Sequence, residues 1–375
     1  MIPRKLQQIV TGKLFKGKAI VIVGARQVGK TTLLQQLTKD KENLLWLNAD
    51  ELPVRSMFDS MSVEQYRTLL GKSEIVVIDE AQRIENVGLK MKLITDNFKE
   101  KQLILTGSSS FDLANKINEP LTGRKWEYKM FPLSFSEMVN YHGLFQETKN
   151  LALRMVFGSY PEVVCNPGSE NTILQQLTNS YLYKDILEWE RIKKPGKLVK
   201  LMQALAYQTG SEISLSELGR TVELDKMTVE KYITLLEQTQ VIFRLSSFSR
   251  NLRNELKASN KIYFYDNGIR NALINNFNMV DNRADTGALW ENFIISERQK
   301  YNHYSENYCN TYFWRTAQQQ EIDYIEEQNG KLHCYEFKWN PKKNAVISKT
   351  FTNAYPDSEF KIIHRENYHQ ILGDF

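Results

Sequence analysis

The sequence predicts an α/β protein in which a parallel sheet is followed by a helical segment and then by a smaller α/β unit. Four short apolar runs alternate with amphipathic or polar segments between residues 19 and 109, which is typical of a parallel sheet covered by helices. Beyond Pro161 the pattern changes to long amphipathic helices, and the last part of the chain returns to a helix followed by strand-like runs. We therefore expect three domains, at residues 1–160, 161–275 and 276–375.

The composition is that of an ordinary globular chain. Of 375 residues, 42% are hydrophobic and 25% are charged, and the apolar run Ala19–Val23 is far shorter than the ~20 residues that a spanning helix needs. With no such helix and no cleavable signal peptide, we expect no membrane partner. Cys165, Cys309 and Cys334 are isolated, which argues against a disulfide framework or zinc knuckle and favours the cytoplasm. A net charge of +5 is too small to identify a nucleic-acid-binding protein.

The four apolar runs are the expected strands of the parallel sheet. They read AIVIVG, LLWLNAD, EIVVIDE and QLILTGSS, and each ends in small or acidic residues. Ligands of such sheets bind at the carboxyl ends of the strands. Because Gly24, Asp79, Glu80 and Ser108 occupy those ends, we expect the functional site there.

The first run continues into a phosphate-binding motif. Residues 24–31, GARQVGKT, fit the pattern G-x4-G-K-[ST], in which glycines let backbone N–H groups curl around phosphate oxygens. Lys30 would add a positive charge toward the β and γ phosphates, and the Thr31 hydroxyl would ligate Mg²⁺. LLQQL continues as a helix whose N-terminus favours the same anion. The predicted nucleotide-binding residues are Gly24, Ala25, Arg26, Gln27, Val28, Gly29, Lys30, Thr31 and Thr32.

A second motif is expected to complete the nucleotide site. EIVVIDEAQ places Asp79 and Glu80 after an apolar run about fifty residues downstream. Asp79 would hold Mg²⁺, and Glu80 would act as the general base toward an attacking water. Ser108 or Ser109, in LILTGSSS, would contact the γ-phosphate or orient water, although serines at such positions also cap helices.

The succession of motifs resembles the prokaryotic AAA+-like P-loop ATPases whose C-terminal half is a domain of unknown function. The resemblance covers nearly the whole chain through GARQVGKTT, LNAD, VVIDEAQR, LILTGSSS, LTGRKWEYKMFPLSFSEM, GSYPEVV and YLYKDILEWE. It implies a set of nucleotide-site residues, namely Lys30 and Thr31 at the phosphates, Asp79 and Glu80 at metal and water, and Ser108 or Ser109 as sensor. It also implies Arg124 as a candidate arginine finger, which would reach the site of a neighbouring subunit in an oligomer.

Adenine is the expected base. P-loop GTPases usually carry an NKxD motif, whose carboxylate accepts hydrogen bonds from guanine. The nearest match is NKIN at Asn115–Asn118, which lacks that carboxylate. ATP and Mg²⁺ are therefore the expected ligands.

A winged-helix pattern is expected in the middle of the chain. ILQQLTNSYLYKDILEWE reads as a long helix, and Pro195–Gly196 marks an expected joint. LSELGRTVELDKMTVEKYITLLEQTQVIFRLSSF then reads as a short helix, a turn, a longer helix and a β-rich segment. Basic residues of the expected wing favour contact with the phosphate backbone of DNA, and packing against the ATPase domain is the alternative. These residues are Arg244, Arg250, Arg253, Lys257 and Lys261.

Residues 276–375 resemble the restriction-endonuclease-like PD-(D/E)XK fold. GALWENFIISERQKY is an expected helix, TYFWRT, EIDYIEE and KLHCYEFKWN are expected strands, and a helix near 347–354 and the strand EFKIIH follow. The residues of the implied nuclease-like site are Glu291, Asp323, Glu336 and Lys338. The acids would hold Mg²⁺, and the lysine would stabilise a pentavalent phosphate or position water. No proline precedes Asp323 and no Q-x3-Y follows Lys338, so a solvated or subunit-contact charged surface is the alternative.

Three functions follow from these expectations. The first is an Mg²⁺-dependent ATPase that acts as a conformational switch or DNA-associated motor. The second is a nuclease whose cutting is gated by the ATPase. The third is a nucleotide-dependent binding protein with little turnover.

Overall fold

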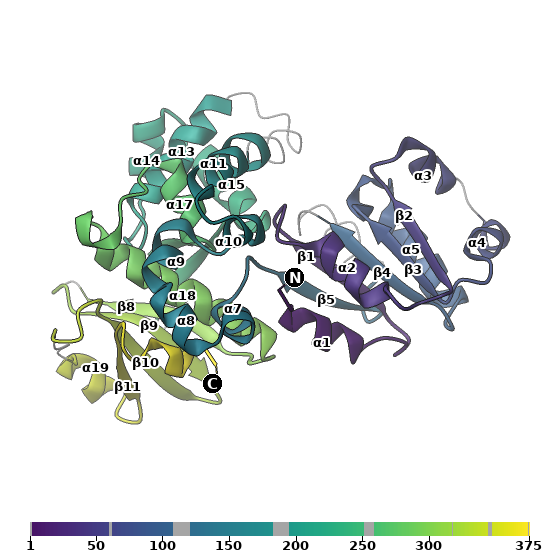
Figure 1. The fold of residues 1–375 in the computed structure, drawn as a ribbon. Helices are drawn as coiled ribbons and strands as arrows, with labels where there is room; N and C mark the ends of the chain where they lie inside the picture. Colours follow the sequence, from purple (N-terminus) through teal and green to yellow (C-terminus); the bar gives the residue numbers. More distant parts are fainter. Residues whose placement is uncertain are drawn as a thin grey trace. The chain divides into compact units, whose positions relative to one another are not determined.

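The fold was analysed in a computed structural model that describes residues 2–59, 62–107, 121–182, 195–250, 259–316, 318–343, 347–373 and 375. The chain forms two compact units. The first contains residues 1–131 together with 238–240, and the second contains residues 132–237 and 241–375. Figure 1 labels most of the helices and strands of both units.

The first unit is built on a five-stranded parallel sheet with strand order β2-β3-β4-β1-β5. Its strands are β1 (Ala19–Gly24), β2 (Leu44–Asn48), β3 (Ile75–Asp79), β4 (Gln102–Gly107) and β5 (Lys125–Met130). Its helices are α1 (Lys5–Thr11), α2 (Lys30–Thr38), α3 (Leu52–Met57), α4 (Val63–Leu70) and α5 (Val87–Asn97), with a 3₁₀ turn at Ala81–Arg83. The parallel α/β sheet predicted from the four apolar runs is thus confirmed.

The central strands of this sheet are apolar because helices cover them. Every residue of β1, β3 and β4 is buried, which explains why these runs read as continuous rather than alternating hydrophobic sequence. The edge strand β5 differs, since only two of its six residues, Tyr128 and Met130, are buried. Its sequence KWEYKM carries no continuous apolar run, so the sequence analysis did not identify it as a strand.

The second unit combines helices with a six-stranded sheet of order β11-β10-β9-β8-β6-β7. Its strands are β6 (Ile242–Ser247), β7 (Asn260–Phe264), β8 (Asn310–Arg315), β9 (Glu321–Gln328), β10 (Lys331–Phe337) and β11 (Glu359–Ile363). Strands β8, β9 and β10 are antiparallel neighbours, whereas β10–β11 and β6–β8 are parallel. The hairpin β6–β7, which lies within the expected winged-helix domain at residues 161–275, therefore belongs to the same sheet as the C-terminal strands.

In Figure 1 most helices of the second unit are drawn above the strands β8–β11. They are α7 (Phe135–His142), α8 (Leu144–Lys149), α9 (Leu151–Phe157), α10 (Pro161–Cys165), α11 (Glu170–Gln176), α13 (Pro195–Tyr207), α14 (Leu215–Val222), α15 (Lys226–Gln238), α17 (Asn267–Leu273), α18 (Thr286–Tyr304) and α19 (Lys349–Ala354). A π-helical turn covers Leu177–Leu182, and 3₁₀ turns cover Val280–Asn282 and Tyr368–Ile371. Helix α18 is joined to β7 by Asn292, whose side chain bonds the amide of Phe264 at 2.7 Å and its carbonyl at 3.0 Å.

Most elements expected in this unit are present. Helices α14 and α15 and strand β6 lie where the helix-turn-helix and β-rich segment were predicted. Pro195 is the first residue of α13, and because the residues directly before it lie outside the described part of the chain, the expected joint at Pro195–Gly196 stays a prediction. Proline suits the first helical position, where its missing N–H would have no partner within the helix. Residues 183–194, in the second half of the expected long helix, lie outside the described residues.

A buried polar clamp joins α17 to the chain between α9 and α10. Asp266 accepts a hydrogen bond from the Ser159 amide at 2.7 Å, and the Asn271 side-chain amide donates to the Val156 carbonyl at 2.8 Å. A Cβ at Gly268 would lie 2.2 Å from the carbonyl oxygen of Phe157. Close backbone contact is therefore the reason for glycine at position 268.

Candidate functional site

The nucleotide-binding loop runs from the end of β1 to the start of α2. Gly29 caps α2 with φ +97°, a left-handed conformation that favours glycine. At Gly24, a Cβ would lie only 2.4 Å from the Met130 carbonyl oxygen on β5. Both glycines of the motif are thus required by the backbone, one for its conformation and the other for close strand packing.

Lys30 and Thr31 lie at the start of α2 with different surroundings. Lys30 is buried, and its ammonium donates to the carbonyl oxygens of Gly24 and Ala25, each at 2.9 Å. The Thr31 side chain reaches the second motif, because its hydroxyl donates to Asp79 Oδ2 at 3.0 Å. The structure therefore brings together the lysine, threonine and aspartate that the sequence predicted from segments 48 residues apart.

Thr106, on β4, is a site residue that the sequence analysis missed. Its hydroxyl donates to Asp79 Oδ1 and accepts from the Glu80 amide at 3.2 Å. One side chain thereby orients both acidic residues at the end of β3. Thr106 is part of the run LILTGSSS, but the predicted role in that run was given to Ser108 or Ser109.

Glu80 follows β3 in a left-handed conformation, with φ +54°. Its carboxylate accepts a hydrogen bond from Gln82 Nε2 at 2.5 Å. Gln82 belongs to the predicted DEAQ segment but was given no role there. The conformation turns the chain sharply after Asp79, so consecutive acidic residues can point in different directions.

Arg4 is a second contributor that the sequence analysis missed. Its buried guanidinium donates to the Val28 carbonyl at 2.7 Å and to the Phe131 carbonyl at 2.6 Å. It therefore ties the nucleotide-binding loop to the chain that follows β5. A single arginine 20 residues before the loop offers no periodic or motif signal by which to recognise it.

The remaining predicted residues of the nucleotide site are Ser108, Ser109 and Arg124. Ser108 and Ser109 lie outside the described residues. Arg124 is half-exposed and forms an ion pair with Asp96 on α5, with Nε and Oδ1 2.6 Å apart. Within this chain, the predicted arginine finger is thus held by a neighbouring carboxylate rather than by the loop at Gly24–Thr31.

The four nuclease-like residues form part of a larger charged cluster in the second unit. Lys338 Nζ lies 2.8 Å from Glu336 Oε2 and 3.8 Å from Asp323 Oδ2. Asp323 also accepts from the Phe337 amide at 2.7 Å. Glu291 is held from β7, where the Tyr263 hydroxyl donates to Oε1 at 2.5 Å and Lys261 Nζ lies 3.3 Å away.

The cluster has strongly shifted acid–base properties. Burial raises the pKa of Glu291 and of Glu336 to about 7 each, and the charge of Asp323 adds to both shifts. Burial also raises the pKa of Asp323. Burial alone would lower the pKa of Lys261, but Glu291 and Glu321 outweigh it and the pKa is raised, so this ammonium stays charged.

The cluster does not have the geometry of a metal site. Within the part of the chain that the structure describes, no three carboxylate, histidine or cysteine side chains converge so that they could hold a metal ion. The predicted acids are instead bonded to two lysines, a tyrosine and a backbone amide. The implied Mg²⁺ therefore does not fit the side chains as they are arranged.

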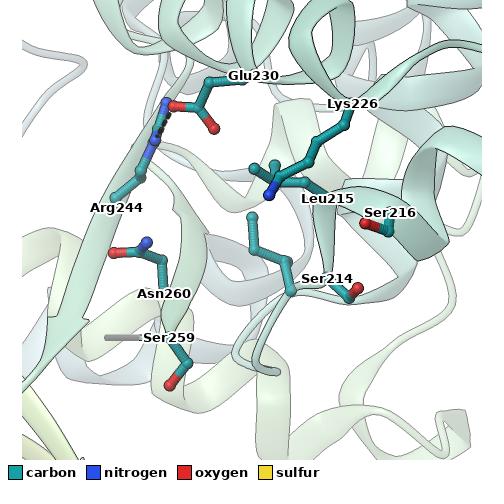
Figure 2. A pocket seen from close by; sticks show the side chains of 9 residues that line it. Ser214, Leu215, Ser216, Lys226, Glu230, Arg244, Ser259 and Asn260 are labelled. Carbon is teal, nitrogen blue, oxygen red and sulfur yellow. Dashed lines mark hydrogen bonds and ion pairs between the residues drawn. The ribbon is translucent and has the colours of Figure 1, made fainter. Parts of the chain in front are cut away.

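The expected DNA-binding residues have varied environments. Arg244 is ion-paired with Glu230, at 2.5 Å, and with Glu237, at 2.9 Å, and it lines a pocket of about 280 Å³ (Figure 2). Carboxylates of the same chain therefore neutralise Arg244. Lys261 is paired as well, since its side chain is 3% exposed and faces the carboxylate cluster. Arg250 lies over the Tyr355 ring, 5.1 Å from its centroid.

The other two basic residues of the expected wing, Arg253 and Lys257, lie outside the described residues. Figure 2 shows the Lys226 side chain extending into the pocket from α15, across from Ser214 at the start of α14.

As to membranes, every helix in the described ranges is too short or too polar to span a bilayer.

Comparison with protein families finds matches along most of the chain. Residues 16–139 match the model of an AAA domain, which agrees with the parallel sheet and with the loop that joins β1 to α2 in the first unit. Residues 148–280 match a domain of unknown function, DUF8612, and residues 286–371 match another, DUF4143.

Individual proteins are similar to this chain over most of its length. The uncharacterized protein Rv2008c of Mycobacterium tuberculosis is 24% identical over 349 residues, which cover 92% of this chain and 75% of that protein. An uncharacterized protein of Haemophilus influenzae is 26% identical over 271 residues, covering 67% of this chain and 68% of its own. Among solved structures, the Walker-type ATPase PABY2304 of Pyrococcus abyssi superimposes with a TM-score of 0.53 at 15% identity, covering 73% of this chain and 96% of that one.

Proposed function

We propose that this protein is an Mg²⁺-dependent ATPase whose nucleotide cycle acts as a conformational switch. The observation that carries the proposal is the 3.0 Å contact between Thr31 Oγ1 and Asp79 Oδ2 at the end of the nucleotide-binding loop. Two oxygen ligands suited to Mg²⁺ lie side by side at the carboxyl edge of the sheet, where α/β proteins of this kind bind nucleotides.

The loop residues would bind the triphosphate. The loop that begins at Gly24 leads directly into the N-terminus of α2, and a helix N-terminus favours anions. The Lys30 ammonium would exchange its two carbonyl partners for phosphate oxygens, since charge-assisted hydrogen bonds to phosphate are stronger than bonds to a neutral carbonyl. Arg4 would keep the loop in place against β5.

Thr31 and Asp79 fit the metal that the fold implies. Both present oxygen, the ligand type that Mg²⁺ prefers, and Thr106 fixes the orientation of the Asp79 carboxylate. When bound, Mg²⁺ would neutralise charge on the phosphate oxygens.

Glu80 would accept the proton of the attacking water. Its amide is held by Thr106 and its carboxylate by Gln82, so the base is positioned from both ends. Arg124 would supply a positive charge to a neighbouring subunit's site after release from Asp96, which makes an oligomer part of this proposal.

Steady-state ATP hydrolysis tests the enzymatic claim. Wild-type protein is expected to release phosphate in the presence of Mg²⁺, whereas Lys30→Ala is expected to lose nucleotide binding and Glu80→Gln to bind ATP without turnover. Lys41→Ala, on the exposed end of the segment after α2, serves as the matched control. Nucleotide binding with no phosphate release above the variants, with or without DNA, would leave the third function, a binding protein with little turnover.

DNA is the proposed macromolecular partner, through the winged-helix-like segment α14–β7. Exposed Arg250 and the basic residues Arg253 and Lys257 would contact the phosphate backbone. Neutralising Arg250 and Arg253 together is expected to weaken binding to duplex DNA. In a plot of the logarithm of the binding constant against the logarithm of salt concentration, the slope is expected to become shallower by about one unit for each lost phosphate contact. Retention unchanged by this double variant would favour the alternative, packing against the ATPase domain.

We do not propose that the second unit is a nuclease. The nuclease hypothesis requires Glu291, Asp323 and Glu336 to hold a divalent cation, and their partners are lysines and hydrogen-bond donors. The same experiment that tests ATP turnover can include DNA and RNA with Mg²⁺ or Mn²⁺. Cutting that disappears in Asp323→Ala or Lys338→Ala would revive the hypothesis.

A further inference from the structure

The carboxylate cluster of the second unit contains more charge than the nuclease-like motif requires. Four acidic side chains contribute to it: Glu291 from α18, Glu321 and Asp323 from β9, and Glu336 from β10. Buried carboxylates need a compensating cation, which in a metal-dependent site is a divalent ion. In this unit two ammonium groups lie among the acids instead.

Lys261 reaches this cluster from outside the nuclease-like motif. It lies on β7, and strands β6 and β8 separate β7 from the acids of β9 in the sheet order. The side chain passes over the ring of Phe313 on β8, with Nζ 5.1 Å from the ring centroid. Its ammonium then lies 2.5 Å from Glu321 Oε1 and 3.3 Å from Glu291 Oε1.

Tyr263, on the same face of β7 as Lys261, bonds one of the same carboxylates. Tyr263 is two residues along β7, and alternation along a strand places both side chains on one side of the sheet. Its hydroxyl donates to the same Glu291 oxygen at 2.5 Å. Since Lys261 is 3% exposed, its ammonium has exchanged most of its hydration for these carboxylates.

We propose that the Lys261 ammonium is the resident cation of this cluster, so that the second unit holds its nuclease-like acids without a divalent metal ion. Lys338 neutralises the other half of the cluster through Glu336 and Asp323. The hairpin β6–β7 thus supplies the charge that a metal would otherwise bring. A metal ion competing for Glu291 would have to displace an ammonium that the chain itself keeps in place.

A comparison of Mn²⁺ binding by wild type and Asp323→Asn tests the proposal directly. Free Mn²⁺ is measured by electron paramagnetic resonance with the full chain at about pH 8, above the pKa of about 7 of Glu291 and Glu336. The nucleotide loop is identical in both proteins, so any Mn²⁺ bound there cancels. We expect equal stoichiometry, and one additional Mn²⁺ in the wild type would overturn the proposal.

Removing the ammonium provides the complementary test. Lys261→Met is expected to gain one Mn²⁺ per chain relative to wild type, and the double variant Lys261→Met, Asp323→Asn is expected to lose that gain. Lys331→Met, at the exposed start of β10 in the same sheet, is the matched control and is expected to gain none. A Lys261→Met protein with wild-type circular dichroism and no added Mn²⁺ would contradict the proposal. If this variant does not fold, the comparison of wild type with Asp323→Asn decides.

Discussion

At the scale of the single residue, Gly24 occupies a position where no side chain fits. It pairs with Met130 on β5, and a Cβ would lie 2.4 Å from the Met130 carbonyl oxygen. We expect Gly24→Ala to destabilise the first unit by about 1–3 kcal/mol and to weaken ATP binding, because the loop or strand must move. Gly12→Ala is the control, since its Cβ would lie 3.6 Å from the nearest atom, an ordinary contact. Equal melting temperatures for both variants would contradict this account.

Thr106 acts on the reaction through the acidic residues that it positions. Thr106→Val keeps the shape of the side chain but removes the hydroxyl that bonds Asp79 and the Glu80 amide. We expect kcat for ATP hydrolysis to fall about 10- to 100-fold, as for other residues that orient metal ligands, with ATP affinity less affected. Thr95→Val, whose hydroxyl bonds only the Met91 carbonyl within α5, should leave kcat unchanged. A Thr106→Val enzyme with wild-type kcat would show that the positioning role is wrong.

Glu336 makes the stability of the second unit depend on pH. Burial, then the charge of Asp323, raises its pKa to about 7, against about 4.3 in an unfolded chain. Between these values the folded state retains a proton that the unfolded state has lost, so the free energy of unfolding falls as the pH rises and then levels off. We expect Glu336→Gln to reduce this fall by on the order of 1–4 kcal/mol, because each unit of pKa difference between the folded and unfolded states contributes about 1.4 kcal/mol. Melting curves at a series of pH values check it. A slope unchanged from wild type, as expected for the exposed control Glu366→Gln, would refute it.

At the scale of the secondary-structure element, the clamp between α17 and the α9–α10 connection tolerates no added volume. Gly268→Ala would place a methyl group 2.2 Å from the Phe157 carbonyl oxygen, so we expect a loss of about 2–3 kcal/mol in the second unit. Gly287→Ala, in α18, has open space around its Cβ and should be neutral or stabilising by up to ~1 kcal/mol. Denaturant titration of the two variants gives the comparison. A Gly268→Ala protein as stable as Gly287→Ala would mean that the close approach is relieved at no cost.

Elements were predictable from the sequence where burial leaves a pattern. Strands β1, β3 and β4 were found because both faces of each are covered and their apolar runs are continuous. The edge strand β2 was found from its apolar run LLWLN, although only Leu47 in it is buried. The edge strand β5 was not found, since its side chains are half-exposed and charged. In the second unit, β8 to β11 and α18 were expected near their observed positions.

The site was predictable where residues lie in one motif, and less so where the sheet brings distant residues together. Lys30, Thr31 and Asp79 were anticipated and are close together. Thr106 escaped notice because its role depends on the β3–β4 pairing, which no local pattern encodes. Lys261 was assigned to a DNA-facing wing because its positive charge is visible in the sequence. Its partners Glu291 and Glu321 are 30 and 60 residues away along the chain, so no local pattern shows that they neutralise it.

At the scale of the whole molecule, the proposed switch requires the nucleotide state of the first unit to affect the second. A ligand shifts a conformational equilibrium only through different affinities for the two states. Hydrogen–deuterium exchange measured with and without Mg²⁺-ATP can detect this in the full chain. Glu80→Gln is the suitable protein, because it is expected to hold ATP without turning it over.

We expect Mg²⁺-ATP to slow amide exchange in Glu80→Gln at residues 24–31 and also to change exchange in elements of the second unit, such as α7 and α9. Slower exchange at the loop follows from ligand binding alone, whereas a change in residues 132–237 or 241–375 requires coupling between the two units. Lys30→Ala, treated with the same nucleotide, controls for effects of ATP that do not depend on the site. If Glu80→Gln binds ATP but all changes remain within the first unit, the protein hydrolyses or holds ATP without acting as a switch.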